Sequence, residues 1–85
     1  MTLKEMRENA NLTRMQVGFK LNVSESCLAH WELGDQTPAK KYRAKLAKMY
    51  GVTVKELVEA SEADVIARRN RRHLREVMRE NLEDA

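Results

Sequence analysis

Two side chains in the middle of the chain have the types and the spacing that a metal site or a reactive thiol would need. Cys27 and His30 stand three residues apart, so a helix would place them on one face. Two ligands do not complete a zinc site, and no cluster of cysteine or histidine accompanies them in the sequence. Redox sensing by Cys27 near a helix N-terminus is the less favoured alternative. We favour a small side chain on a helix surface.

The sequence contains no motif of a known catalytic centre. A P-loop, a G-x-S-x-G elbow and an H-E-x-x-H pair are all missing. His73 stands among arginines, and we expect its side chain to be solvated or to lie at the edge of the apolar stripe of the C-terminal segment. The sequence therefore predicts neither an enzyme nor a bound cofactor or metal.

Length and composition limit the chain to a small helical domain. Its 85 residues suffice for one domain, or for one domain with an appendage. The hydrophobic fraction of 42% and the charged fraction of 34% fit a soluble helical protein. One cysteine excludes an internal disulfide framework, and neither a membrane span nor a signal peptide is visible, so we expect a cytoplasmic protein. The net charge of +3 permits nucleic acid as a partner without requiring it.

Capping signals divide the first sixty residues into five short helices. Thr2–Glu5, Thr13–Gln16 and Thr53–Glu56 have the spacing of a capping box, in which two side chains bind the free amides at a helix start. Asparagine or glycine follows each of the first four helical patterns, as at helix ends. The expected helices run from Thr2 to about Asn9–Asn11, from Thr13 to Asn22, over Glu25–Leu33, from Thr37-Pro38 to Gly51, and from Thr53 to about residue 60.

The last part of the chain has a different composition. Residues 62–85 contain six arginines and no glycine, proline, lysine or aromatic residue. Its apolar residues form one broken stripe: Ile66, Leu74, Val77, Met78 and Leu82. The predicted fold is therefore all-α, with a compact five-helix domain over residues 1–60 and a C-terminal amphipathic, Arg-rich helix over residues 61–85.

The stretch from Leu12 to Gly34 has the plan of a helix-turn-helix. Two short helices are joined by a tight turn at Asn22, a residue that tolerates positive φ. Gly18 lacks a Cβ, as a close approach of the two helices would require. The apolar residues expected in the structural core are Val17, Leu21, Leu28, Trp31 and Leu46. In this motif the second helix enters the major groove of DNA with its N-terminal residues first.

The sequence resembles the Cro/cI-like (XRE) helix-turn-helix regulators of phages and bacteria over about residues 2–58. The residues that carry the resemblance are Leu12-Thr13, Leu21-Asn22-Val23-Ser24, Trp31-Glu32-Leu33-Gly34, Pro38 and the run Leu46–Leu57. The resemblance implies a compact five-helix domain that acts as a dimer on a partly symmetric operator. It also implies that Glu25–Leu33 is the recognition helix and that Arg7 forms an ion pair with Glu32.

Specific contacts with double-stranded DNA follow from this arrangement. The residues expected to read bases are Ser24, Glu25, Ser26, Ala29 and His30, with Cys27 facing or near the DNA. Those expected to bind phosphates are Arg7, Thr13, Arg14, Lys40 and Lys41. Glu25 can accept from cytosine N4, and Ala29 can contact a thymine methyl group.

Two functions from different classes remain open. The first is a transcriptional regulator, a repressor that binds a two-fold operator as a homodimer. The second is an antitoxin or accessory subunit whose Arg-rich helix binds an acidic protein partner.

An oddity of the second helix bears on the dimer. Met15 and Phe19 are apolar residues on a face of this helix that lies outside the core pattern. An exposed apolar patch is unfavourable in water, so we expect another element to pack on it. We expect the C-terminal stripe to dock on an apolar surface of the globular domain or, preferably, on the same helix of a second protomer.

Overall fold

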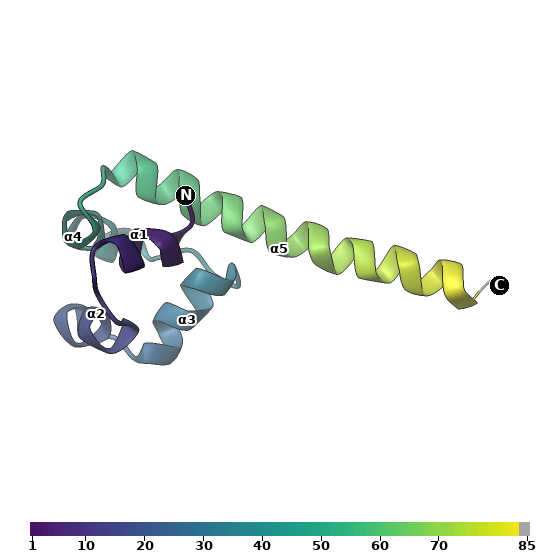
Figure 1. Cartoon of the computed structure of the whole chain (residues 1–85), viewed down its shortest axis with the longest axis horizontal. Coiled ribbons are helices and arrows are strands. Elements are labelled where there is room, and N and C mark those ends of the chain that lie inside the picture. Colours follow the sequence, from purple (N-terminus) through teal and green to yellow (C-terminus); the bar gives the residue numbers. More distant parts are fainter. Residues whose placement is uncertain (84–85) are drawn as a thin grey trace.

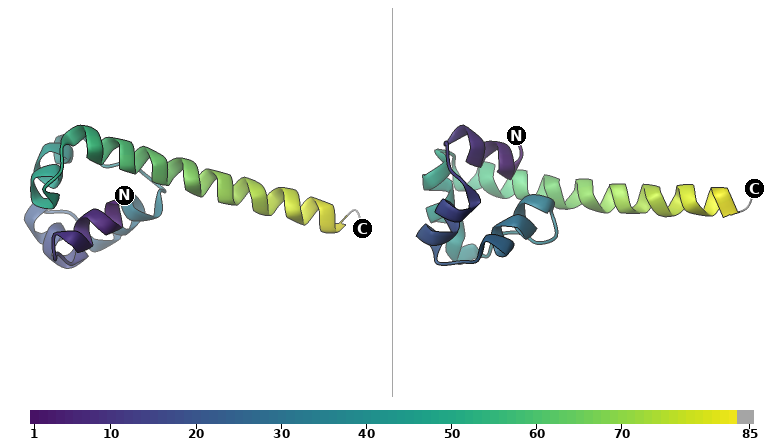
Figure 2. Two further views of the ribbon diagram at one scale, coloured as in Figure 1. Left: turned by 45° about the horizontal axis from the view of Figure 1, so that its top comes forward. Right: turned by 60° about the horizontal axis from the view of Figure 1, so that its bottom comes forward.

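A computed structural model of the chain describes residues 1–83, and the side chains of residues 1–81. Within residues 1–83 the chain forms five α-helices and no strand, which confirms the predicted all-α fold. The helices are α1 (Leu3–Asn9), α2 (Arg14–Leu21), α3 (Glu25–Leu33), α4 (Lys40–Tyr50) and α5 (Val54–Glu83). Helices α1 to α4 and the first turns of α5 form a compact body, and the rest of α5 projects from it (Figure 1). Two further views show the same projection (Figure 2).

The first helices begin where the side-chain caps were predicted. The Thr2 hydroxyl accepts from the amide of Glu5 at 3.1 Å, and the Glu5 carboxylate accepts from the amide of Thr2 at 3.2 Å. Thr13 and Gln16 form the same reciprocal pair at 3.1 and 2.9 Å. Ser24 caps α3 by accepting from the amide of Cys27 at 3.1 Å. Local sequence therefore determines where α1, α2 and α3 start.

The core lies between α5 and the four short helices. The five predicted core residues Val17, Leu21, Leu28, Trp31 and Leu46 are between 0% and 6% exposed. The same cluster also contains Leu3 and Met6 from α1, Ala47 and Tyr50 from α4, and Leu57 and Ala60 from α5. The Trp31 ring packs on Tyr42 with a centroid separation of 5.7 Å. The first turns of α5 are thus part of the globular core.

Helix α4 begins two residues later than the sequence predicts. Thr37 and Pro38 were expected to supply its cap and first residue, but Ala39 holds the cap position with extended backbone and no side-chain cap. Pro38 is buried, and its carbonyl accepts a hydrogen bond from Nε of Arg43 at 3.0 Å. Tertiary packing of Pro38 therefore replaces the local start signal.

The expected break between the fifth helix and the C-terminal segment is wrong, because α5 is continuous over Val54–Glu83. Thr53 caps its start by accepting from the amide of Glu56 at 3.0 Å. No glycine or proline follows within the helix, and a change in composition does not end a helix. The division into domains at residue 60 stays a prediction, although Asp64 and Arg68 both contact the globular body.

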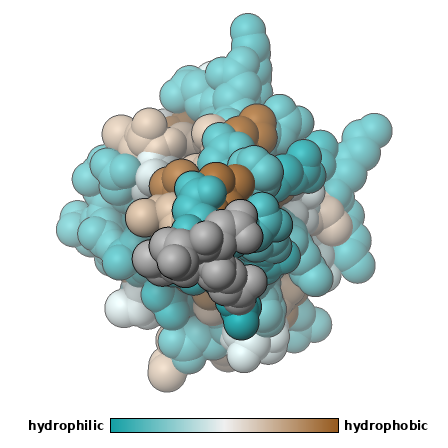
Figure 3. Space-filling view, turned by 90° about the vertical axis from the view of Figure 1, so that its right-hand side faces the viewer, coloured by the Kyte–Doolittle hydropathy of each residue, from teal (hydrophilic) through white to brown (hydrophobic). Residues whose placement is uncertain are grey.

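Docking of the C-terminal stripe on the globular body of the same chain is also wrong. Ile66, Leu74, Val77 and Met78 are between 38% and 58% exposed, and Met15 and Phe19 are 69% and 88% exposed. The side chain of Leu82 lies outside the described residues. When the surface is viewed along α5 from its C-terminal end, exposed hydrophobic residues form patches between hydrophilic residues (Figure 3). The projecting part of α5 runs away from the body and from α2 (Figure 1).

Candidate nucleic-acid interface

The turn between α2 and α3 brings the two helices into close contact. A Cβ on Gly18 would lie 2.8 Å from the carbonyl oxygen of Val23 and 3.5 Å from a methyl group of Leu28. Asn22 adopts the left-handed conformation, with φ of 58°, and ends α2. Both features were predicted, and together they fix the start of α3 against the end of α2.

Helix α3 has one buried and one exposed side. Leu28 and Trp31 point into the core, with 1% and 3% exposure. The opposite side carries the predicted base-reading residues. Ser24, Glu25, Ser26 and His30 are exposed, and Ala29 is half-buried. Cys27 is half-buried as well. The structure therefore places the five residues along α3, from its N-cap Ser24 to His30 in its last turn, while their contacts with DNA remain a prediction.

The predicted phosphate-binding residues lie in different environments. Thr13 is exposed at the N-cap of α2, and Arg14 follows it as the first helical residue. Lys40 and Lys41 are exposed at the start of α4, and the Lys41 ammonium lies 4.9 Å from the centre of the Tyr42 ring. Arg7 differs from the others because it is only 8% exposed.

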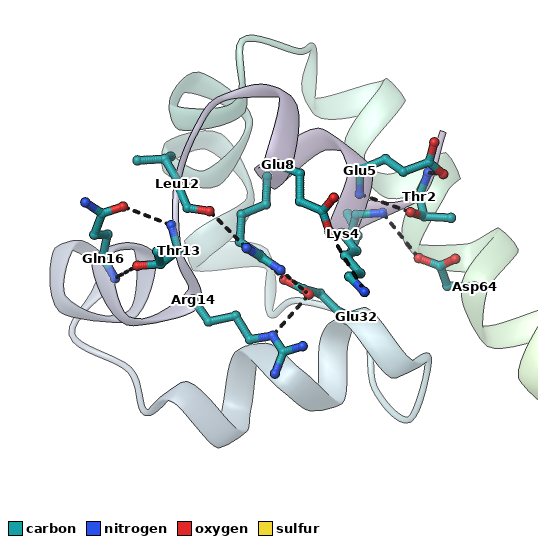
Figure 4. Close-up of polar contacts among 12 residues, drawn as sticks. Thr2, Lys4, Glu5, Glu8, Leu12, Thr13, Arg14, Gln16, Glu32 and Asp64 are labelled. Atoms are coloured by element: carbon teal, nitrogen blue, oxygen red, sulfur yellow. Dashed lines mark hydrogen bonds and ion pairs between the residues drawn. The ribbon is translucent and has the colours of Figure 1, made fainter.

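An ion pair with two arginines links α1, α2 and α3 (Figure 4). The Glu32 carboxylate accepts from Nε and Nη2 of Arg7 at 2.7 and 3.1 Å, as the resemblance implied. It also accepts from Nε of Arg14 at 3.3 Å, a contact that the sequence did not predict. Nη1 of Arg7 donates to the carbonyl of Leu12 at 2.9 Å. The hydrogen bonds that Arg7 donates to the Glu32 carboxylate hold the pKa of Arg7 above its ordinary value.

The burial of this cluster separates the roles of its two arginines. The side chain of Glu32 is 5% exposed and that of Arg7 is 10% exposed, whereas that of Arg14 is 38% exposed. All three guanidinium nitrogens of Arg7 donate to oxygens of Glu32 or Leu12, so Arg14 is the cation of this cluster that solvent reaches best. Arg14 stands at the N-terminus of α2, where a phosphate is also favoured by the helix dipole.

A second polar cluster joins α3 to α5. Nδ1 of His30 lies 2.9 Å from Oδ2 of Asp35, and Nε of Arg68 lies 2.7 Å from Oδ1 of the same carboxylate. The hydrogen bond with His30 and the positive charge of Arg68 lower the pKa of Asp35. Sequence analysis missed this cluster, because nothing local indicates that Arg68 folds back against the loop after α3.

The arginines of α5 form a basic surface beside this cluster. Arg68, Arg71, Arg72 and Arg75 line one shallow groove along the helix. A neighbouring groove, which contains Gly34 and Asp35, continues it to the end of α3. The basic surface thus starts beside the exposed side of α3 and follows α5 outward.

Comparison with known proteins agrees with this geometry. Residues 1–60 match the family model described as a helix-turn-helix domain. The chain belongs to the helix-turn-helix family. It is an XRE-like member of that family, and the two curated relatives that it matches are named as transcriptional regulators.

Two curated relatives span most of this chain. The HTH-type transcriptional activator BcrR of Enterococcus faecalis is 30% identical over 76 residues, which cover 88% of this chain and 37% of the relative. The cryptic phage CTXphi transcriptional repressor RstR of Vibrio cholerae is 32% identical over 63 residues, which cover 74% of this chain and 57% of the relative. The chain thus matches about a third to just over half of their lengths.

No solved structure gives a significant match to the chain. In the part of the chain that the structure describes, no helix has the length and apolar character needed to cross a membrane.

Proposed function

We propose that the chain is a sequence-specific regulator of transcription that places α3 in the major groove of double-stranded DNA. One observation carries this proposal: the N-terminal half of α3 presents polar side chains to solvent, while its other side anchors the helix in the core through Leu28 and Trp31. A recognition helix needs both properties, because a rigid support keeps the reading side chains in register with the bases.

Each exposed residue of α3 has a role that its chemistry allows. Glu25 accepts a hydrogen bond from the amino group of cytosine, and Ser24 and Ser26 accept or donate. Ala29 contacts a thymine methyl group, and His30 lies about one turn beyond Ser26. These residues supply the sequence preference of the protein.

Phosphate contacts supply most of the affinity. Arg14 and the capped N-terminus of α2 form one anchor, and Lys40 with Lys41 at the start of α4 forms another. Arg7 belongs to the first anchor through Glu32, which contacts both arginines.

We propose that the chain acts as a homodimer formed by the exposed stripe of α5. Ile66, Leu74, Val77 and Met78 leave a long apolar band on a helix that projects from the body. Such a band is unfavourable in water, and an isolated helical extension of this length gains stability when a second helix covers it.

The charges beside the stripe favour a second copy in parallel orientation. With about 100° between successive helical residues, Arg68, Arg71 and Arg75 flank one side of the stripe. Glu62, Glu76 and Glu80 stand on its other side, together with Arg69. In a parallel pair the basic side of one helix faces the acidic side of its partner, whereas an antiparallel pair brings arginine against arginine. A parallel pair also keeps both recognition helices at one end of the dimer, as a two-fold operator requires.

Repression from a two-fold operator is the mode of action that we propose, in the cytoplasm. The half-sites would be about one helical turn apart, roughly 34 Å. The relative named as a repressor supports this mode, because the chain spans more of its length than of the relative named as an activator.

The basic surface of α5 supports a second function. Arg71 and Arg75 are exposed along the groove on α5. This surface suits an acidic protein partner, as in an antitoxin or an accessory subunit, and such a role is compatible with DNA binding by α3.

Binding to duplex DNA at several salt concentrations tests the proposed anchors. Arg14→Ala is expected to weaken binding to all sequences alike and to reduce the salt slope by about one unit. The matched control is Lys55→Ala, which removes a cation whose side chain is 84% exposed near the start of α5 and which is not one of the proposed anchors. Equal salt slopes for the two variants would contradict a phosphate contact at Arg14.

Sedimentation of the full chain tests the dimer. Leu74→Glu puts a charge into the stripe and is expected to give a folded monomer. The control Arg72→Ala changes a residue on the face of α5 opposite the stripe and is expected to stay dimeric. Truncation after Ser61 is a poorer test, because it also removes Asp64 and Arg68, which contact α1 and the loop after α3. A Leu74→Glu protein that remains dimeric would contradict the role of the stripe.

A further inference from the structure

The loop after α3 carries a carboxylate that touches both the recognition helix and α5. One oxygen of Asp35 lies 2.9 Å from Nδ1 of His30, and the other lies 2.7 Å from Nε of Arg68. Asp35 therefore connects a proposed base-reading side chain to the helix that carries the dimer stripe. Nothing in the helix-turn-helix motif itself requires this connection.

The hydrogen bond with Asp35 determines where the proton of the neutral His30 ring sits. The pKa of Asp35 is lowered by His30 and Arg68, so at neutral pH its carboxylate has only acceptor oxygens. Nδ1 of His30 must then carry the hydrogen that joins them. In the neutral ring the other nitrogen, Nε2, keeps its lone pair and is an acceptor.

The backbone and α5 hold Asp35 in position. Gly34 ends α3 with φ of 83°, and a Cβ on it would collide with the carbonyl oxygen of Asp64 in α5. The loop is thus seated directly on α5. Arg68 reaches the free oxygen of Asp35 from the same helix, and Arg72 adds a further positive charge nearby.

We propose that Asp35 is a specificity-positioning residue, which fixes the tautomer and orientation of His30 so that Nε2 faces the DNA as an acceptor. Arg68 holds Asp35 in this role. The proposal rests on the proposed function of α3. In the major groove an acceptor pairs with the amino group of adenine or cytosine, whereas guanine and thymine present acceptors. His30 therefore prefers adenine or cytosine at the base that it contacts.

The test is a selection of bound duplexes from a random pool at pH 8. His30→Ala identifies the position that this side chain reads. The wild-type chain is expected to prefer adenine or cytosine there by about tenfold. In Asp35→Ala the preference at that position falls below about threefold, and Arg68→Ala gives an intermediate value. The other positions keep their preferences.

Gln36→Ala is the matched control, because it truncates the next residue of the same exposed loop and is expected to leave the profile unchanged. A carboxylate with a purely structural role would lower affinity for all sequences alike. Such a uniform loss in Asp35→Ala, or a profile identical to that of the wild type, would overturn the proposal.

Nitrogen NMR of the His30 ring in the free protein at pH 8 gives a second readout. The wild type is expected to carry its hydrogen on Nδ1, and Asp35→Ala is expected to show both tautomers. A wild-type ring with its hydrogen on Nε2 would overturn the proposal even if the chain binds DNA. If the wild type selects no sequence, both the proposed function and the base-reading role of His30 are wrong. The NMR result still decides whether Asp35 sets the tautomer of His30.

Discussion

Replacing Glu32 with alanine is expected to cost a large part of the stability of the domain. The Glu32 side chain is 5% exposed and receives two hydrogen bonds from Arg7, whose own side chain is 10% exposed. Glu32→Ala leaves this buried guanidinium without an anion, a change that costs about 3–5 kcal/mol. A chain of this size has a free energy of unfolding of roughly 4–13 kcal/mol. The variant should therefore be marginally stable or largely unfolded at 37 °C.

Urea unfolding followed by circular dichroism measures the effect. The matched control is Lys4→Ala in the exposed pair Lys4–Glu8, which spans 3.9 Å and should contribute less than about 0.5 kcal/mol. The double variant Arg7→Met with Glu32→Leu removes both charges and should recover most of the loss, because apolar side chains suit the same buried space. A Glu32→Ala chain that loses no more stability than Lys4→Ala would refute this reasoning.

Three further changes test other parts of the structure. Trp31→Ala should lower the free energy of unfolding by about 3–5 kcal/mol, since the ring is 3% exposed. Circular dichroism at 37 °C should show a largely unfolded chain. A stable variant that only lost DNA affinity would make Trp31 a contact residue. Gly51→Ala should lower the free energy of unfolding by about 1–2 kcal/mol, because Gly51 has a left-handed backbone. Gly34→Ala should lower it more in the same urea assay, because the new Cβ also meets the backbone of Asp64. Equal losses of stability in the two variants would contradict the close contact between Gly34 and α5. The lowered pKa of Asp35 contributes stability that is present above the ordinary value of 3.8 and is lost as the pH falls through the lower folded value. When the pH is lowered below about 4, the urea concentration at the unfolding midpoint should therefore decrease in the wild type, and it should decrease less in Asp35→Asn. Parallel pH profiles of the two proteins would exclude this contribution.

Local signals in the sequence predicted the start and end of the first helices. The capping pairs at Thr2 and Thr13 act within four residues, so their chemistry is readable without the fold. Asn22 and Gly34 end their helices because the left-handed conformation is a property of the single residue. The core positions followed from the same helical spacing, and Gly18 was correctly interpreted as a site of close approach.

Features that depend on packing between distant segments were not predictable. The continuity of α5 is a partial exception, because the absence of glycine and proline after Gly51 is a local signal. The change to an arginine-rich composition was wrongly interpreted as the start of a separate element. The contacts of Glu32 with Arg14 and of Asp35 with Arg68 join residues from different helices, and no local pattern indicates them. Phe19 is 88% exposed, and its apolar character did not indicate that the other helices would leave it uncovered.

The central claim is that the exposed side of α3 reads the sequence of double-stranded DNA. Selection of bound duplexes from a random pool, run in parallel on the wild type and on Glu25→Ala, tests it most directly. The wild type is expected to enrich a two-fold motif with half-sites about one helical turn apart, and Glu25→Ala should change the preferred base at one position of each half-site. A wild-type chain that enriches no sequence, or a Glu25→Ala variant that enriches the same motif with only altered affinity, would contradict the claim.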